Sequence, residues 1–138
     1  CNRKKVDNII NFFGPIKHEK INDYLLKGDL YISLNNYGQL SNSNLDAIGS
    51  GLCLIFSETK RENDLILKKM GLTEERVFWI KQGSSEKHLS KIITYLVKNK
   101  NKIIQYKKFS RKIAFNIPLM SDRMMWEKNL IKKHLKRS

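Results

Sequence analysis

The sequence predicts an α/β fold built on a parallel sheet. Four apolar runs, each as long as a buried strand, alternate with segments whose apolar residues recur at helical spacing. This alternation indicates parallel strands joined by helical crossovers. The chain has 138 residues, 41% of them hydrophobic, which is enough for one domain and no more. We therefore expect a single domain over residues 1–138, with about four parallel strands flanked by helices and a helical C-terminal tail.

The first part of the chain reads as helix, strand, helix and strand. Residues 3–8 resemble the end of a helix, and residues 9–13 form an apolar run that we expect to be a buried strand ending at a Gly-Pro pair. Residues 17–27 carry apolar side chains on one helical face. Residues 30–34 then form the second expected strand.

Residues 29–58, DLYISLNNYGQLSNSNLDAIGSGLCLIFSE, form the most informative stretch. They read as a strand, a polar loop, a helix that ends at Gly-Ser-Gly, and a buried strand at residues 52–56. Ser41, Asn42 or Ser43 can each cap the helix. Ligands bind at the carboxyl ends of strands in open parallel sheets, and a helix N-terminus there suits a phosphate. The alternative is a capped turn that binds nothing.

The second half of the chain is mainly helical, with one further strand. Lysines occupy the polar faces of its expected helices. In order, we expect a short helix at residues 65–70, a strand at 77–80, a helix from Ser84 or Ser85 to about Val97, a helix through 103–113 with an interruption near Asn101, and a last amphipathic helix at 121–136.

The net charge of +14 lies entirely in the second half. Residues 1–75 carry ten basic and ten acidic residues, whereas residues 76–138 carry 17 and three. Such asymmetry indicates an anionic partner: membrane phospholipid, nucleic acid or a phosphorylated substrate. The alternative is codon bias, because lysine greatly outnumbers arginine. The lysines that we expect to face an anionic membrane include Lys87, Lys91, Lys98, Lys102 and Lys108.

Several site types are disfavoured by the sequence. No apolar run approaches the roughly 18 to 20 residues of a membrane span, so we expect a soluble protein. Cys53 is expected to be a small core residue, and Cys1 as a lipid-bearing residue is disfavoured because a basic helix follows it. His18, His88 and His134 have no partners at ligand spacing, so we expect solvated side chains and no metal site.

The central stretch resembles the nucleotide-sugar signature of the family 4 glycosyltransferases, which have the GT-B fold. Here it reads Y-G-Q-L-S-N-S-N-L-D-A-I-G-S-G-L, and the family commonly has Y-E-G-F-G-L-P-V-L-E-A-M-A-C-G-x-P. Asp46 falls on the second family glutamate and Gly38 on the first. Residues 9–16 are similar to the family's V-x-F-x-G-x-V, residues 29–31 to A-D-L-F-V, and residues 121–127 to S-W-E-E-R.

The resemblance implies the C-terminal, donor-binding half of a glycosyltransferase, with a Rossmann-like sheet. The parent enzyme would transfer a sugar with retention from a nucleotide-diphosphate donor, with no metal or other cofactor, in polysaccharide biosynthesis. A glycan or lipid-linked acceptor would bind a separate N-terminal domain. The first two βα units of the donor domain are expected to precede this chain, which would be inactive alone. The expected location is cytoplasmic, including the cytoplasmic membrane face.

The resemblance also implies the residues that bind the donor. Backbone N–H groups of the loop would face the diphosphate, Asp46 would accept hydrogen bonds from the ribose, and a second loop would contact the base. The alternative for Asp46 is a first-turn acid that complements the helix dipole. The diphosphate loop consists of Gly38, Gln39, Leu40, Ser41 and Asn42, and the base loop of Gly14, Pro15 and Ile16.

Two departures from the family affect the expected site. The first glutamate, which contacts the donor sugar, is Gly38 here, so sugar recognition would rest on Asn35, Asn36, Gln39 or Asn42. The family's basic pair for the pyrophosphate belongs to the missing units, and no catalytic residue is assigned. Two alternatives remain open: a membrane-bound domain without catalysis, and a nucleic-acid-binding module, which the scarcity of arginine and interleaved aromatic residues disfavours.

Overall fold

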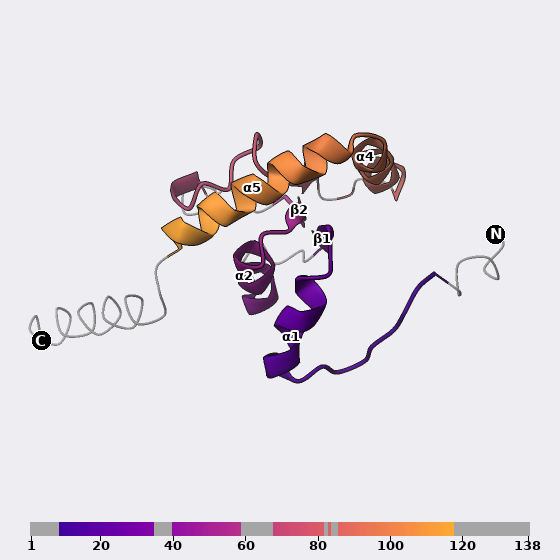
Figure 1. Ribbon diagram of the computed structural model, residues 1–138. Helices are drawn as coiled ribbons and strands as arrows, with labels where there is room; N and C mark the ends of the chain where they lie inside the picture. Colours follow the sequence, from indigo (N-terminus) through magenta and orange to yellow (C-terminus); the bar gives the residue numbers. More distant parts are fainter. Residues whose placement is uncertain (1–8, 35–39, 59–67, 82, 84–85, 118–138) are drawn as a thin grey trace, which may run out of the picture.

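The computed structural model describes residues 9–34, 40–58, 68–81, 83 and 86–117, and Figure 1 shows their arrangement. The predicted α/β class and the parallel sheet are confirmed. The strands are β1 (Leu30–Ser33), β2 (Cys53–Ser57) and β3 (Phe78–Ile80), in the order β1-β2-β3. Both pairings are parallel, and every residue of the central strand β2 is buried.

Within the described ranges, four complete helices flank the sheet. They are α1 (His18–Leu25), α2 (Asn42–Gly49), α4 (Glu86–Lys98) and α5 (Lys100–Asn116). The break expected near Asn101 lies at Asn99, between α4 and α5. The side-chain amide of Asn99 donates a 2.8 Å hydrogen bond to the backbone carbonyl of Tyr95. This bond caps a carbonyl in the last turn of α4, where that helix ends.

The two faces of β2 point into different apolar clusters. Leu54 and Phe56 pack with residues of α2 and with Ile113 of α5. Cys53 and Ile55 pack on the other face, with residues of α4 and of the first half of α5. Helices therefore cover both faces of the sheet, as the near-continuous apolar sequence of β2 requires. The prediction that Cys53 is a core residue is confirmed, since its side chain is fully buried.

Helix α5 crosses the amino-terminal edge of the sheet. The buried hydroxyl of Ser110 donates to the carbonyl of Leu52, just before β2. Lys107 lies one turn earlier, and its Nζ contacts the carbonyl of Gly28 at 3.2 Å and the carboxylate of Asp29 at 3.1 Å, just before β1. The carboxyl edge, where ligands bind in such sheets, is therefore at the opposite end from α5. Figure 1 shows α1 and α2 extending away from α5.

The strand predicted at residues 9–13 is wrong. The described sheet has three strands rather than about four, and the outer edge of β1 meets no strand within the described ranges. Ile9, Phe12 and Phe13 are 78%, 93% and 59% exposed. The run has strand composition, but a strand forms only where it finds a partner. Its one ring contact joins Phe13 to Tyr24 of α1, with centroids 4.8 Å apart.

Several predicted elements lie outside the described residues. These are the helices at 3–8 and 121–136, the first half of the helix at 65–70, and the capping pair Ser84 and Ser85. Among the helices that are described, none is both long and apolar enough to cross a lipid bilayer.

Candidate functional site

The start of α2 lies just beyond the carboxyl end of β1, as the sequence predicts. Of the three possible caps, the structure selects Ser41, whose Oγ accepts a 3.2 Å hydrogen bond from the backbone N–H of Asn44. The carbonyl of Ser41 accepts from the N–H groups of Asn44 and Leu45. The N–H groups of Asn42 and Ser43 have no acceptor among the described residues. They are the donors that this helix start can offer to an anion.

A partly buried hydrogen bond joins α2 to β1 at this point. Asn44 is 4% exposed, and its Oδ1 accepts a 3.2 Å hydrogen bond from the hydroxyl of Tyr31 in β1. Burial raises the pKa of Tyr31, and the negative charge of Asp46 raises it further, while the nearby hydroxyls of Ser33 and Ser43 lower it. Tyr31 therefore stays a neutral hydrogen-bond donor at physiological pH.

An aromatic row continues from Tyr31 across the sheet. The rings of Tyr31 and Phe56 meet edge to face at 6.3 Å, and those of Phe56 and Trp79 at 5.9 Å. These three side chains come from the three strands and face the cluster that contains α2. Such edge-to-face pairs add to the burial energy of the rings. The row therefore supports Tyr31, and through it the start of α2, from beneath.

Asp46 lies in the second turn of α2 and is partly buried. The alternative of a first-turn acid is wrong, because the first turn of α2 contains no acidic residue. Within the described part of the chain, Asp46 forms no salt bridge. It lies close enough to Tyr31 to affect the pKa of the phenol. A partly exposed carboxylate of this kind can accept hydrogen bonds from a ligand.

The structure relates the other predicted donor-site residues less closely to the start of α2. Leu40 packs against the core cluster of α2, so only its backbone can serve a ligand. Gly14 and Pro15 are exposed and Ile16 is partly buried, in the segment before α1. Within the described ranges, no hydrogen bond joins this segment to α2. The remaining residues, Gly38, Gln39, Asn35 and Asn36, lie outside the described residues.

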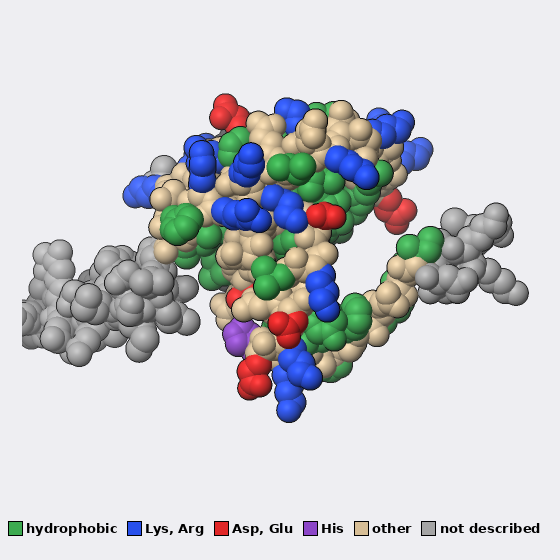
Figure 2. Space-filling model, in the orientation of Figure 1, with side chains coloured by type: hydrophobic (Ala, Val, Ile, Leu, Met, Phe, Trp, Pro, Cys, Tyr) green, Lys and Arg blue, Asp and Glu red, His purple; other side chains and the backbone are tan. Residues whose placement is uncertain are grey.

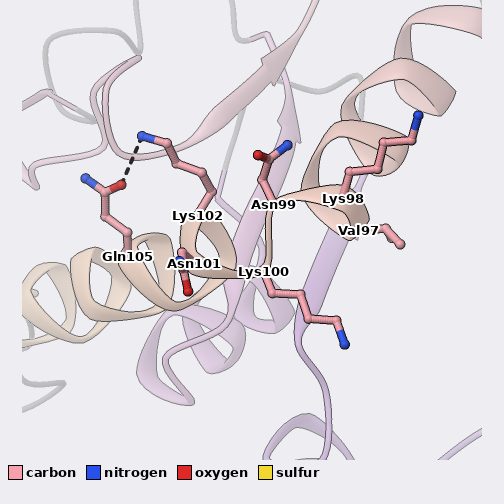
Figure 3. Close-up of a pocket in the computed structure, with 7 residues that line it drawn as sticks. All are labelled: Val97, Lys98, Asn99, Lys100, Asn101, Lys102 and Gln105. Carbon is pink, nitrogen blue, oxygen red and sulfur yellow. Dashed lines mark hydrogen bonds between the residues drawn. The ribbon is translucent and has the colours of Figure 1, made fainter.

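A separate hollow of about 520 Å³ lies at the turn between α4 and α5. It takes no residue from β1 or α2. Figure 3 shows the side chains of Lys98 and Lys100 pointing apart, while Lys102 contacts Gln105 at 3.2 Å. This hollow is therefore distinct from the start of α2, and its lysines do not point toward one common point. Its lining consists of Val97, Lys98, Asn99, Lys100, Asn101, Lys102 and Gln105.

The sequence reasoning missed the pair formed by Tyr31 and Asn44. A signal was present, because Asn44, Ala47 and Ile48 recur at helical spacing on the buried face of α2. A polar residue at a core position of this kind needs a hydrogen-bond partner. Among the described residues, no group of three His, Cys, Asp or Glu side chains is arranged so that it could bind a metal ion.

Comparison with known proteins gave no match. Neither a protein-family model, nor a curated protein, nor a solved structure is significantly similar to this chain. The assignment of a function therefore depends on the sequence signature and on the geometry at the start of α2.

Proposed function

We propose that this chain is the nucleotide-sugar-binding part of a family 4 glycosyltransferase with the GT-B fold. The parent enzyme transfers a sugar with retention from a nucleotide-diphosphate donor to a glycan or lipid-linked acceptor. One observation carries the proposal. At the carboxyl edge of the sheet, one βα junction provides the N–H groups of Asn42 and Ser43 at the start of α2, and Asp46 follows in the next turn of the same helix.

Each group at this junction has a role that follows from its chemistry. The N–H groups of Asn42 and Ser43, at the positive end of the dipole of α2, bind the donor diphosphate. Asp46 accepts hydrogen bonds from the ribose hydroxyls. When the bond between the anomeric carbon and the diphosphate breaks, negative charge grows on the leaving diphosphate. Fixed N–H donors stabilise that charge without reorganising.

The hydrogen bond between Tyr31 and Asn44 serves this arrangement indirectly. It holds the first turn of α2 against the end of β1. Because Asn44 is buried, the bond resists rotation of the helix start. Tyr31 and Asn44 are therefore positioning residues in the proposal and do not touch the donor.

The bare edge of β1 supports the proposal in a second way. Ile32 and Leu34 are 39% and 50% exposed beside this edge, although parallel sheets normally bury both faces. In the family that the sequence resembles, two further strands lie between the strand matching residues 9–13 and the strand matching β1. An exposed apolar run and an open β1 edge agree with this arrangement. Those units would also supply the basic pair that completes the diphosphate site.

The test is a calorimetric titration with UDP, GDP and ADP. We expect Asp46→Ala to weaken the binding of the preferred nucleotide by about 1 to 3 kcal/mol, because a charged hydrogen-bond acceptor is lost. The matched control is Asp23→Ala, which removes an exposed aspartate from α1 and leaves affinity unchanged. If Asp46→Ala binds as tightly as the original chain while its circular dichroism is unaltered, the ribose assignment fails.

A further inference from the structure

The outward face of α5 combines cations with exposed apolar side chains. Ile104 and Phe115 are 52% and 91% exposed, and the three cations near them are also exposed. The five residues follow one another at spacings of four, four, three and four, so they form one stripe along the helix. We call this surface the α5 outer stripe; it consists of Lys100, Ile104, Lys108, Arg111 and Phe115.

Within α4 and α5 the one acidic residue is Glu86, at the start of α4 and far along the chain from these cations. Residues 87–117 contain nine lysine and arginine residues and no aspartate or glutamate. The acidic group that reaches α5 is Asp29, and it pairs with Lys107 on the flank of the helix. Figure 2 shows Lys and Arg side chains distributed along α5, with hydrophobic side chains among them. The stripe is therefore both strongly cationic and partly apolar.

The opposite face of α5 packs into the core. Ser110 and Ile113 are fully buried there, so α5 cannot turn its outer stripe inward. The helix has 17 residues and is about 25 Å long. Single exposed apolar residues are ordinary, but alternation with cations along one face of a helix is typical of helices that lie in a membrane interface.

We propose that the α5 outer stripe docks this protein on an anionic lipid bilayer. Phe115 and Ile104 enter the headgroup region, while Lys100, Lys108 and Arg111 contact lipid phosphates. A nucleic acid fits the same charge less well, because successive bases stack on several rings and the stripe offers the single ring of Phe115. The inference is independent of the donor site, since no residue of α2 takes part in it.

This docking sets the orientation of the domain. Helix α5 lies at the amino edge of the sheet, so that edge faces the bilayer. The start of α2 lies at the other end of the strands, roughly 15 Å farther from the lipid for strands of this length. The carboxyl edge therefore stays open to solution, where a water-soluble ligand can reach it.

The first test is sedimentation of the full 138-residue chain with vesicles. We expect binding to phosphatidylcholine vesicles that contain phosphatidylglycerol, and none to pure phosphatidylcholine. Because charge attraction is screened over about 10 Å at about 0.1 M salt, binding should fall steeply as salt is raised. Equal binding to neutral and anionic vesicles, or binding to neither, would overturn the proposal.

Two triple variants separate the stripe from the overall charge of the chain. Each removes three positive charges from exposed basic residues. Near an anionic surface each basic residue strengthens binding, so the α5 variant should bind on the order of 100-fold more weakly, whereas the control should stay within about threefold. Equal losses in both variants would refute a local surface. The α5 variant is Lys100→Gln/Lys108→Gln/Arg111→Gln, and the control is Lys20→Gln/Lys27→Gln/Lys81→Gln.

A second pair of variants tests the apolar part of the stripe. Phe115→Ser should weaken vesicle binding about tenfold, because the buried ring is lost from the interface. Phe12→Ser is the matched control, since Phe12 is 93% exposed against 91% for Phe115, and it should change nothing. If Phe115→Ser binds vesicles normally and single-stranded RNA binds the chain more tightly than anionic vesicles do, the surface serves nucleic acid and the proposal is wrong.

Discussion

The hydrogen bond between Tyr31 and the buried side chain of Asn44 offers a quantitative test of how the candidate site is held. Asn44→Ala removes the acceptor of the phenol, which lies at 3.2 Å, at a position that is 4% exposed. Losing a buried hydrogen bond and leaving its partner unsatisfied costs about 1 to 3 kcal/mol. Alanine regains up to about 0.6 kcal/mol of helix propensity. We therefore expect the free energy of unfolding to fall by about 1 to 2 kcal/mol.

A double-mutant cycle isolates the bond itself. Tyr31→Phe should cost about 1 kcal/mol, because the ring and its contact with Phe56 remain. The double variant should be more stable than the sum of the single effects predicts, by about 1 kcal/mol, since the two side chains interact. Asn22→Ala, at an exposed position of α1, is the control and should change stability by less than about 0.5 kcal/mol.

The assay is urea unfolding followed by circular dichroism at constant pH. The slope of the unfolding transition should be the same in all variants, so that the midpoints report stability. If Tyr31→Phe and Asn44→Ala were additive within about 0.3 kcal/mol, the two side chains would be energetically independent. The structural account of how α2 is fixed to β1 would then be wrong.

Three further predictions concern the cap, the amino edge and the core thiol. Ser41→Ala should lower the free energy of unfolding by about 1 kcal/mol, and Ser41→Gly should lower it by a few tenths. Ser41→Ile should also abolish donor binding, because its side chain crowds the backbone. Equal stability of all three variants would refute the cap. Ser110→Ala should cost about 1 to 2 kcal/mol in urea unfolding, because the carbonyl of Leu52 loses its donor, and an unchanged midpoint would contradict this. Burial raises the pKa of Cys53 from 9.0 to about 12. In a Cys1→Ser variant, thiol reagents should therefore react with Cys53 about 1000-fold more slowly in the folded chain than in the unfolded chain. The folded state holds the thiol proton more tightly than the unfolded state does. The protonated thiol therefore stabilises the fold fully below pH 9, and this stabilisation is lost as the pH rises from about 9 to about 12. Cys53→Ala should reduce the fall in the free energy of unfolding over that pH range.

The order of elements was predictable because local pattern decides it. The polar loop before α2 predicts a cap, and the fully apolar run at β2 predicts a central strand buried on both faces. The choice of Ser41 over its neighbours was not predictable, because it depends on the burial of Asn44 against Tyr31. For the same reason, Asp46 lies two residues deeper in the helix than a cap at Ser43 would have placed it.

Residues 9–13 and the stripe on α5 show what pattern alone cannot decide. The apolar run has the composition of a strand, but pairing depends on an edge elsewhere in the fold. On α5, the lysines named from the sequence do not share one face, since Lys102 lies about 120° around the helix from Lys108. The apolar partners Ile104 and Phe115 became visible only when the buried face was known.

The central claim is that a nucleoside diphosphate binds at the start of α2. It is tested most directly by following the backbone amides of the chain by ¹⁵N NMR during titration with UDP, GDP and ADP at millimolar concentration. The account predicts that the largest shifts occur at Asn42 and Ser43, with smaller changes at Asp46. Shifts confined to Lys98, Lys100 and the rest of the α4–α5 turn, with Asn42 and Ser43 unmoved, would mean that the diphosphate only pairs with surface lysines, and would contradict the claim.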